Sequence, residues 1–117
     1  MFVLVKVNDS VTQGDVLNWN ETSSSWEVGS NLSITFGVAR EDAYTLDGTN
    51  YIARVSFAGS CYAKAGSDIP EQGGKLACSN GKVIVDNNTV DEVGFVTPNP
   101  FGHDPRVENE LVLIYIR

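Results

Sequence analysis

Residues 111–116 read Leu-Val-Leu-Ile-Tyr-Ile, six apolar residues without interruption. The run is much shorter than the roughly 18 to 20 apolar residues that a membrane-spanning helix needs, and its composition is typical of a strand. A strand with one solvated face alternates apolar and polar residues, so this run predicts a strand that is covered on both sides. The cover is either the domain's own core or a neighbouring subunit. The same interpretation applies, less forcibly, to Phe-Val-Leu-Val at residues 2–5.

The rest of the chain has the spacing of turn residues that is typical of an all-β protein. Apolar residues fall in short runs or alternate, and Gly, Asn, Asp or Ser interrupts them every few positions. We therefore predict a small β-barrel or β-tulip-like domain of short strands and hairpins, with little or no helix. If a helix is present, we expect it to be a single turn at residues 40–44. The predicted strands are residues 2–7, 15–19, 25–28, 33–39, 51–58, 61–63, 75–78, 82–85, 92–97 and 110–116.

A weak internal echo runs through these strands. Gly14-Asp15-Val16-Leu17 begins a segment that passes a polar tip and reaches Phe36-Gly37-Val38, and Gly73-Gly74-Lys75-Leu76 begins one that reaches Val93-Gly94-Phe95 at similar spacing. The tip of the second segment contains Asn80-Gly81, a pair that tolerates positive φ in a hairpin turn. In each unit a Gly turn leads into a hairpin, and a later strand has a central Gly that admits a close neighbour. Two copies favour a barrel or sandwich of related hairpin units, although small β proteins also show such coincidences by chance.

The length of 117 residues predicts a single β domain spanning 1–117. No basic segment precedes the apolar run at its start and no small-residue cleavage site follows it, so we expect a strand there and not a secretory signal. Residues 97–105 hold three of the four prolines and are predicted to form a loop or extended arm before the C-terminal strand at 110–116.

Charge argues against a nucleic-acid partner, and the short apolar segments argue against a membrane partner. The chain has 8 Lys and Arg against 15 Asp and Glu, a formal net charge of -7, and its basic residues are scattered singly. Nucleic-acid backbones are bound by clustered basic side chains, so we expect no nucleic-acid partner. No segment is long and apolar enough to predict a membrane partner.

The residue types that carry catalysis are sparse and poorly placed. His103 is the only histidine, and its neighbour Asp104 points to the opposite side of an extended chain. No Ser lies in the context of a nucleophile elbow. Cys61 and Cys78 lack a zinc-ligand spacing, and we expect two reduced thiols, with a disulfide as the alternative. The sequence thus predicts a protein that is not an enzyme, with no catalytic residues, no metal site and no cofactor.

Large aromatic side chains are the better candidates for contacts. Trp19 and Trp26 flank a polar tip, where they form either an exposed platform for a sugar or partner protein or simply a stabilising hairpin pair. Phe101, between Pro100 and Gly102, is either an anchor for a partner's pocket or a residue packed on its own domain.

The order of these features resembles the small β-rich head decoration, or cement, proteins of tailed bacteriophages, the lambda-type decoration protein and its relatives. The resemblance covers roughly Val11 to Val96. It is carried by Gly14-Asp15-Val16-Leu17, the strand that ends in Phe36-Gly37-Val38-Ala39, the strand Tyr51–Phe57, and the run Tyr62-Ala63-Lys64-Ala65-Gly66-Ser67-Asp68-Ile69-Pro70 that leads to Gly73 and Leu76. Both ends depart from the family. The lambda-type protein begins with a polar, flexible arm, whereas residues 1–7 here are typical of a strand, and the Pro-rich loop with the strand at 110–116 is an addition.

The resemblance implies a structural virion protein that is made in the host cytoplasm and lies on the outer surface of the capsid. Such proteins form homotrimers, bind the major capsid protein and stabilise contacts between capsomers, without chemistry. The alternatives are another virion β module, such as a head fibre, neck or tail component or receptor-binding head, and a carbohydrate-binding module. Candidate contact residues are the large apolar side chains of the terminal strands, the hairpin and the Pro-rich loop: Phe2, Leu4, Trp19, Trp26, Phe101, Leu111, Leu113 and Tyr115.

Overall fold

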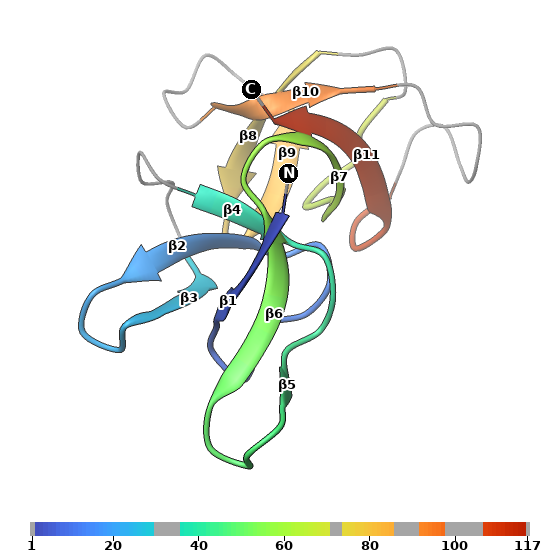
Figure 1. Ribbon diagram of the computed structural model, residues 1–117. Helices are drawn as coiled ribbons and strands as arrows, with labels where there is room; N and C mark the ends of the chain where they lie inside the picture. The colour runs from blue at the N-terminus through green and yellow to red at the C-terminus, as the bar shows by residue number, and fades with distance from the viewer. Residues whose placement is uncertain (1, 30–35, 71–73, 86–91, 98–106, 117) are drawn as a thin grey trace.

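The computed structural model describes residues 2–29, 36–70, 74–85, 92–97 and 107–116, and within them the chain forms strands and no helix. Figure 1 shows the strands gathered into two sheets, one from each half of the chain. Every strand pair within the two sheets is antiparallel. The predicted all-β fold class is confirmed.

The first sheet comes from the N-terminal half and has the strand order β1-β6-β4-β2-β3, with β5 paired to β6. Its strands are β1 (Phe2–Lys6), β2 (Val16–Asn20), β3 (Ser25–Val28), β4 (Phe36–Ala39), β5 (Tyr44–Thr45) and β6 (Tyr51–Ser56). The second sheet has the order β7-β11-β10-β8-β9. Its strands are β7 (Gly59–Lys64), β8 (Lys75–Ser79), β9 (Lys82–Val85), β10 (Glu92–Val96) and β11 (Leu111–Ile116).

The expectation of little or no helix is confirmed for the described residues, and residues 40–44, where any helix was expected to lie, form none. The chain bends at residues 40–41, and Tyr44 and Thr45 form β5. The bend is held by Glu41, whose carboxylate accepts hydrogen bonds from the backbone N–H and the guanidinium of Arg54 at 2.8–3.1 Å. The predicted strands are present with small shifts at their ends, and residues 33–35 of the fourth lie outside the described residues.

The internal echo extends to the whole topology. Replacing β1, β2, β3, β4 and β6 by β7, β8, β9, β10 and β11 converts the strand order of the first sheet into that of the second. The registers agree as well, since Gly37 of β4 lies opposite Leu17 and Gly94 of β10 lies opposite Leu76. The two halves of the chain are therefore structural repeats.

Each sheet is rolled, so that its two end strands meet. An isolated parallel bridge joins Val7, just after β1, to Trp26 of β3, and the equivalent bridge joins Ala65 to Val83. Neither sheet is a continuously paired closed barrel. Each half is thus an open roll with an apolar interior.

The cores of the two rolls are connected. One buried cluster fills the first roll and includes Leu17, Ala53 and Val55. The other fills the second roll and also includes Val16 and Val38, which come from β2 and β4 of the first sheet. The first half therefore inserts part of its outer face into the core of the second.

The lack of space for a side chain at Gly37 and Gly94 predicts that substitution of either lowers stability. A Cβ at Gly94 would meet the backbone carbonyl oxygen of Tyr115, and a Cβ at Gly37 would meet the side chains of Val55 and Phe57. We expect Gly94→Ala and Gly37→Ala each to lower the free energy of unfolding by about 1–3 kcal/mol, with the larger loss at Gly94, because backbone yields less readily than side chains. Urea unfolding followed by tryptophan fluorescence measures both. Gly48→Asn is the control, because Gly48 has open space and a φ of +81° that Asn tolerates; an equal loss in all three variants would contradict the prediction.

Candidate functional site

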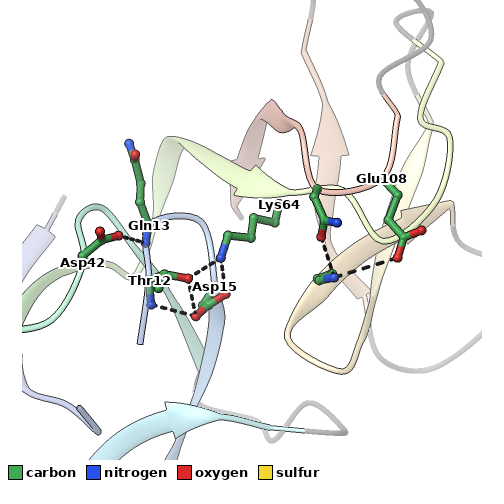
Figure 2. A network of polar contacts seen from close by, with 8 residues as sticks. Thr12, Gln13, Asp15, Asp42, Lys64 and Glu108 are labelled. Carbon is green, nitrogen blue, oxygen red and sulfur yellow. Dashed lines mark hydrogen bonds and ion pairs between the residues drawn. The ribbon is translucent and has the colours of Figure 1, made fainter. Parts of the chain in front are cut away.

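A polar network ties the two halves together where β2 begins. Lys64 of β7 donates to Asp15 Oδ1 at 3.1 Å and also to the hydroxyl of Thr12. Asp15 Oδ2 accepts from the backbone N–H of Thr12 at 2.8 Å and from its hydroxyl at 3.1 Å. Figure 2 shows these side chains converging between the two halves. Asp15 is buried and Lys64 is half-buried, so the ion pair is partly shielded from water.

This network has the character of a structural clasp. Both carboxylate oxygens of Asp15 and the ammonium of Lys64 are engaged with one another or with Thr12. A separate set of contacts, also drawn in Figure 2, lies within the second half and runs from Lys82 to Asn109 at 2.6 Å and to Glu108 at 3.9 Å. Because Asp15 and Lys64 are committed to each other and to Thr12, their network fixes the two halves and leaves neither charged group available for proton transfer.

A cavity of about 250 Å³ lies where the two halves meet. It is lined by Gln13, Arg40, Ser60, Cys61, Tyr62 and Leu113. Burial raises the pKa of the Cys61 thiol to about 12, so the thiolate needed for nucleophilic attack is absent at neutral pH. The guanidinium of Arg40 stands over the ring of Phe2 at 4.3 Å from its centroid. The cavity thus has an aromatic and cationic wall but no activated nucleophile.

Acidic and thiol groups do not gather into a metal site within the part of the chain that the structure describes. Of the acidic doublet Glu41-Asp42, the first binds Arg54, whose guanidinium lowers the pKa of Glu41, and the second accepts the backbone N–H of Gln13 at 2.8 Å. Cys61 and Cys78 are both buried and form no disulfide. His103 and its neighbour Asp104 lie outside the described residues.

The two tryptophans sit directly opposite one another on β2 and β3. Their rings are edge to face with centroids 5.6 Å apart, and Trp26 makes a second edge-to-face contact with Phe57 at 5.0 Å. Trp26 packs against the core of the first roll, whereas Trp19 is 44% exposed. Because the rings are not coplanar, the pair does not form a flat platform, and only Trp19 offers a surface to a partner.

The candidate residues of the terminal strands lie on the outer faces of the two sheets. On β11, Val112, Ile114 and Ile116 point into the core and are buried, whereas the alternate residues Leu111 and Leu113 are half-buried and Tyr115 is exposed. On β1, Phe2 and Leu4 are both exposed. The chain's own core thus covers one side of β11 only. Phe101 lies outside the described residues.

Two further candidate contact residues lie in the two sheets and were missed in the sequence. Phe95 of β10 lies opposite Tyr115 and stacks on it, with ring centroids 5.4 Å apart and an interplanar angle of 27°. Val3 of β1 is 46% exposed although its partner Val55 is buried. The sequence did contain a signal for Phe95, because this residue follows Gly94 in the second copy of the internal repeat.

Comparisons with known proteins leave the function to be inferred from these surfaces. No protein-family model, curated protein or solved structure matches the chain. The resemblance to phage decoration proteins therefore stays a prediction. Within the described residues, no helix is long and apolar enough to cross a membrane.

The different burial of the two tryptophans predicts different effects of truncation. Trp26→Ala removes a ring that contacts Phe57 and the core, and we expect a loss of about 2–4 kcal/mol in the free energy of unfolding. Trp19→Ala removes an edge-to-face partner on the surface, worth about 0.5–1.5 kcal/mol. Urea denaturation monitored by circular dichroism compares them; a larger loss at Trp19 would contradict the geometry.

The buried thiol gives a prediction on pH. Because folding raises the pKa of Cys61 from 9.0 to about 12, the folded protein disfavours the thiolate, and stability falls as pH rises above 9. In a Cys78→Ala background at pH 8, we expect iodoacetamide to label Cys61 at least about 100-fold more slowly in the folded protein than in urea. Mass spectrometry follows the labelling, with Cys61→Ala, Cys78→Ala as the blank. Equal rates in both states would show that the thiol is accessible and ionisable in the fold.

Proposed function

We propose that the protein is a structural virion protein of a tailed bacteriophage, a decoration or cement protein that binds the outer surface of the head as a homotrimer. It contacts the major capsid protein and stabilises the contacts between capsomers. The observation that carries the proposal is the set of large apolar side chains on the outer faces of β1 and β11, which the chain's own core leaves partly uncovered. Partly uncovered apolar faces of this kind mark contact with other proteins.

The polar groups of the described residues support binding over chemistry. The Asp15–Lys64 pair is committed to Thr12, the Glu41 carboxylate is committed to Arg54, and the Cys61 thiol is protonated. A catalytic site needs at least one acid, base or nucleophile left available to a substrate. These groups instead stabilise the fold, which suits a protein whose function is mechanical.

The strand β1 offers the most direct contact with a shell. It lies at the end of its sheet, with β6 as its neighbour and only a single bridge to β3 beyond its C-terminal end. Among the described residues, most of its outer edge carries backbone groups without a sheet partner, and the side chains of Phe2 and Leu4 are exposed beside it. Because these two side chains form an exposed apolar face, we assign the capsid contact to the outer face of β1.

Trp19 favours a second candidate function. Its exposed ring at the tip of the β2–β3 hairpin is the kind of surface with which a carbohydrate-binding module or the receptor-binding module of a virion stacks on sugars. A single ring is a smaller surface than the faces of β1 and β11. The decoration role is therefore the better supported of the two.

Binding to heads tests the proposed function directly. The purified chain is mixed with expanded, DNA-free heads of the phage that encodes it, prepared without this protein, and sedimented. We expect saturable co-sedimentation, and we expect Leu4→Asp to weaken it at least tenfold, because a charged group is placed in an apolar contact. Trp19→Ala is the matched control, because it removes an exposed apolar side chain elsewhere on the same sheet.

Two results would count against the decoration role. One is the absence of co-sedimentation at any concentration. The other is binding to a glycan array that Trp19→Ala abolishes while the fold is retained, which would favour the carbohydrate-binding alternative.

A further inference from the structure

The two repeats bury equivalent surfaces to very different extents. A row of residues runs across the outer face of each sheet, aligned by the strand registers. The first row is Val16, Val38 and Ser56, on β2, β4 and β6. The second row is Lys75, Phe95 and Tyr115, on β8, β10 and β11. Because the two sheets share strand order and register, the second row is the structural counterpart of the first.

The first row is fully used within the chain. Its three residues are at most 1% exposed, and Val16 and Val38 belong to the buried cluster of the second roll. The second row is in the opposite condition, since Lys75 is exposed, Tyr115 is 42% exposed and Phe95 is half-buried beneath the stacked tyrosine. As far as the described residues go, the second row is therefore a face of the same design with no second sheet docked on it.

The surface that receives the first row is also repeated. In the second half, β7 lies beside β4, and the backbone N–H of Val16 donates to the carbonyl of Gly81, in the turn between β8 and β9, at 2.8 Å. Cys61 of β7 lies in the same buried cluster as Val16 and Val38 and is only 7% exposed. We call this surface, formed by β7 and the turn at residues 80–81, the mouth of the second roll.

The corresponding mouth of the first roll stands open. Val3 pairs with the buried Val55 just as Cys61 pairs with the buried Ile114, so Val3 is the counterpart of Cys61. Yet Val3 is 46% exposed. Within the described residues, no row is inserted into the mouth of the first half, and no mouth receives the row of the second half.

We propose that a second copy of this chain fills the vacancy, with the second row of one copy inserted into the mouth formed by β1 and the β2–β3 turn of the next. The contact between copies then repeats the contact between the two halves of one chain. Each copy carries both complementary surfaces, so the association is head to tail and either closes a ring or continues as a filament. The inference deepens the self-association in the proposed function and rests on that part of it, while it is independent of capsid binding.

Charge agrees with this docking. The turn that receives Val16 is Asn80-Gly81, and its counterpart in the first half is the turn at residues 21–24, which begins with the exposed Glu21. Lys75 occupies the place of Val16 in the second row, so docking brings a lysine to a glutamate. In a chain with net charge -7, one such pair at the contact offsets part of the repulsion between copies.

The test uses two variants that damage opposite sides of the contact. Tyr115→Glu places a negative charge in the second row, and Val3→Asp places one in the mouth of the first roll. Light scattering of the wild type is expected to give a mass that is a whole multiple, greater than one, of the 12.7 kDa chain. Each variant alone is expected to be a monomer, because its dissociation constant for self-association rises at least about 30-fold. When the two variants are mixed, one intact row meets one intact mouth, and a heterodimer of one copy of each is expected.

Controls separate this contact from a general loss of stability. Tyr62→Glu is matched to Tyr115→Glu, because Tyr62 is also an exposed tyrosine on the outer face of the second sheet but lies outside the row; it should leave the mass unchanged. The charge variant Lys75→Glu, which leaves the core untouched, should weaken association about two- to fivefold, and Glu21→Lys in the same chain should restore it. Circular dichroism checks that each variant is folded.

A monomeric wild type, an unchanged mass for folded Tyr115→Glu, or a mixture that stays monomeric would each overturn the inference. Head binding is scored separately by sedimentation. A monomer that still binds heads would overturn head-to-tail association alone. An oligomer that does not co-sediment with heads would overturn the decoration role alone.

Discussion

The insertion of the first row into the second roll is the contact on which the rest of the structure depends. Val16 and Val38 are fully buried in a core whose other members come from the second half, so neither half has a complete apolar surface alone. The chain reaches this position through Gly14, at a φ of +90°, whose carbonyl accepts the backbone N–H of Lys64 at 2.9 Å. A Cβ there would lie 2.7 Å from Leu111 Cδ2 and 3.0 Å from the backbone nitrogen of Lys64, so both conformation and space demand glycine.

The polar clasp beside this contact contributes orientation more than binding energy. An ion pair that is partly removed from water loses hydration, which offsets much of its Coulombic gain. The pair between Asp15 and Lys64 nevertheless accepts few alternative positions, because Thr12 also binds both partners. The apolar row holds the halves together, and the clasp fixes how far one sheet slides along the other.

The sequence predicted the strands well because short-range patterns determine them. Alternation and turn residues give β3 and β9 their observed bounds, and the echo around Gly37 and Gly94 anticipated a duplication that proved to include the whole strand order. Residues 40–44, where any helix was expected to lie, form none, because a tertiary hydrogen bond from Arg54 to Glu41 holds that segment bent. Local composition carries no information about such a partner.

The candidate contacts were predicted less completely, because exposure depends on register. The apolar run of β11 predicted a strand covered on both sides, whereas the chain's own core covers one side, and cover of the other side by a neighbouring subunit stays a prediction. Only the pairing with β7 and β10 shows that Tyr115 faces outward beside Phe95. Val3 is apolar and faces inward. Its exposure follows from the absence of an inserted row in the mouth of the first roll among the described residues, which its residue type does not indicate. The capsid role and Phe101 are beyond what the described residues test, so they stay predictions.

The chemical difference between the two rows agrees with a difference in what each must overcome. The first row docks within one chain, where the partner is tethered at high effective concentration, and small aliphatic side chains suffice. The second row, in the proposed contact, must also offset the translational and rotational freedom lost when two molecules join. Phe95 and Tyr115 provide more contact area than valine and serine, and the tyrosine hydroxyl keeps that surface compatible with water before assembly. An aliphatic second row would be an aggregation hazard on the free chain, whereas a stacked aromatic pair beside a lysine suits a contact that forms only between copies.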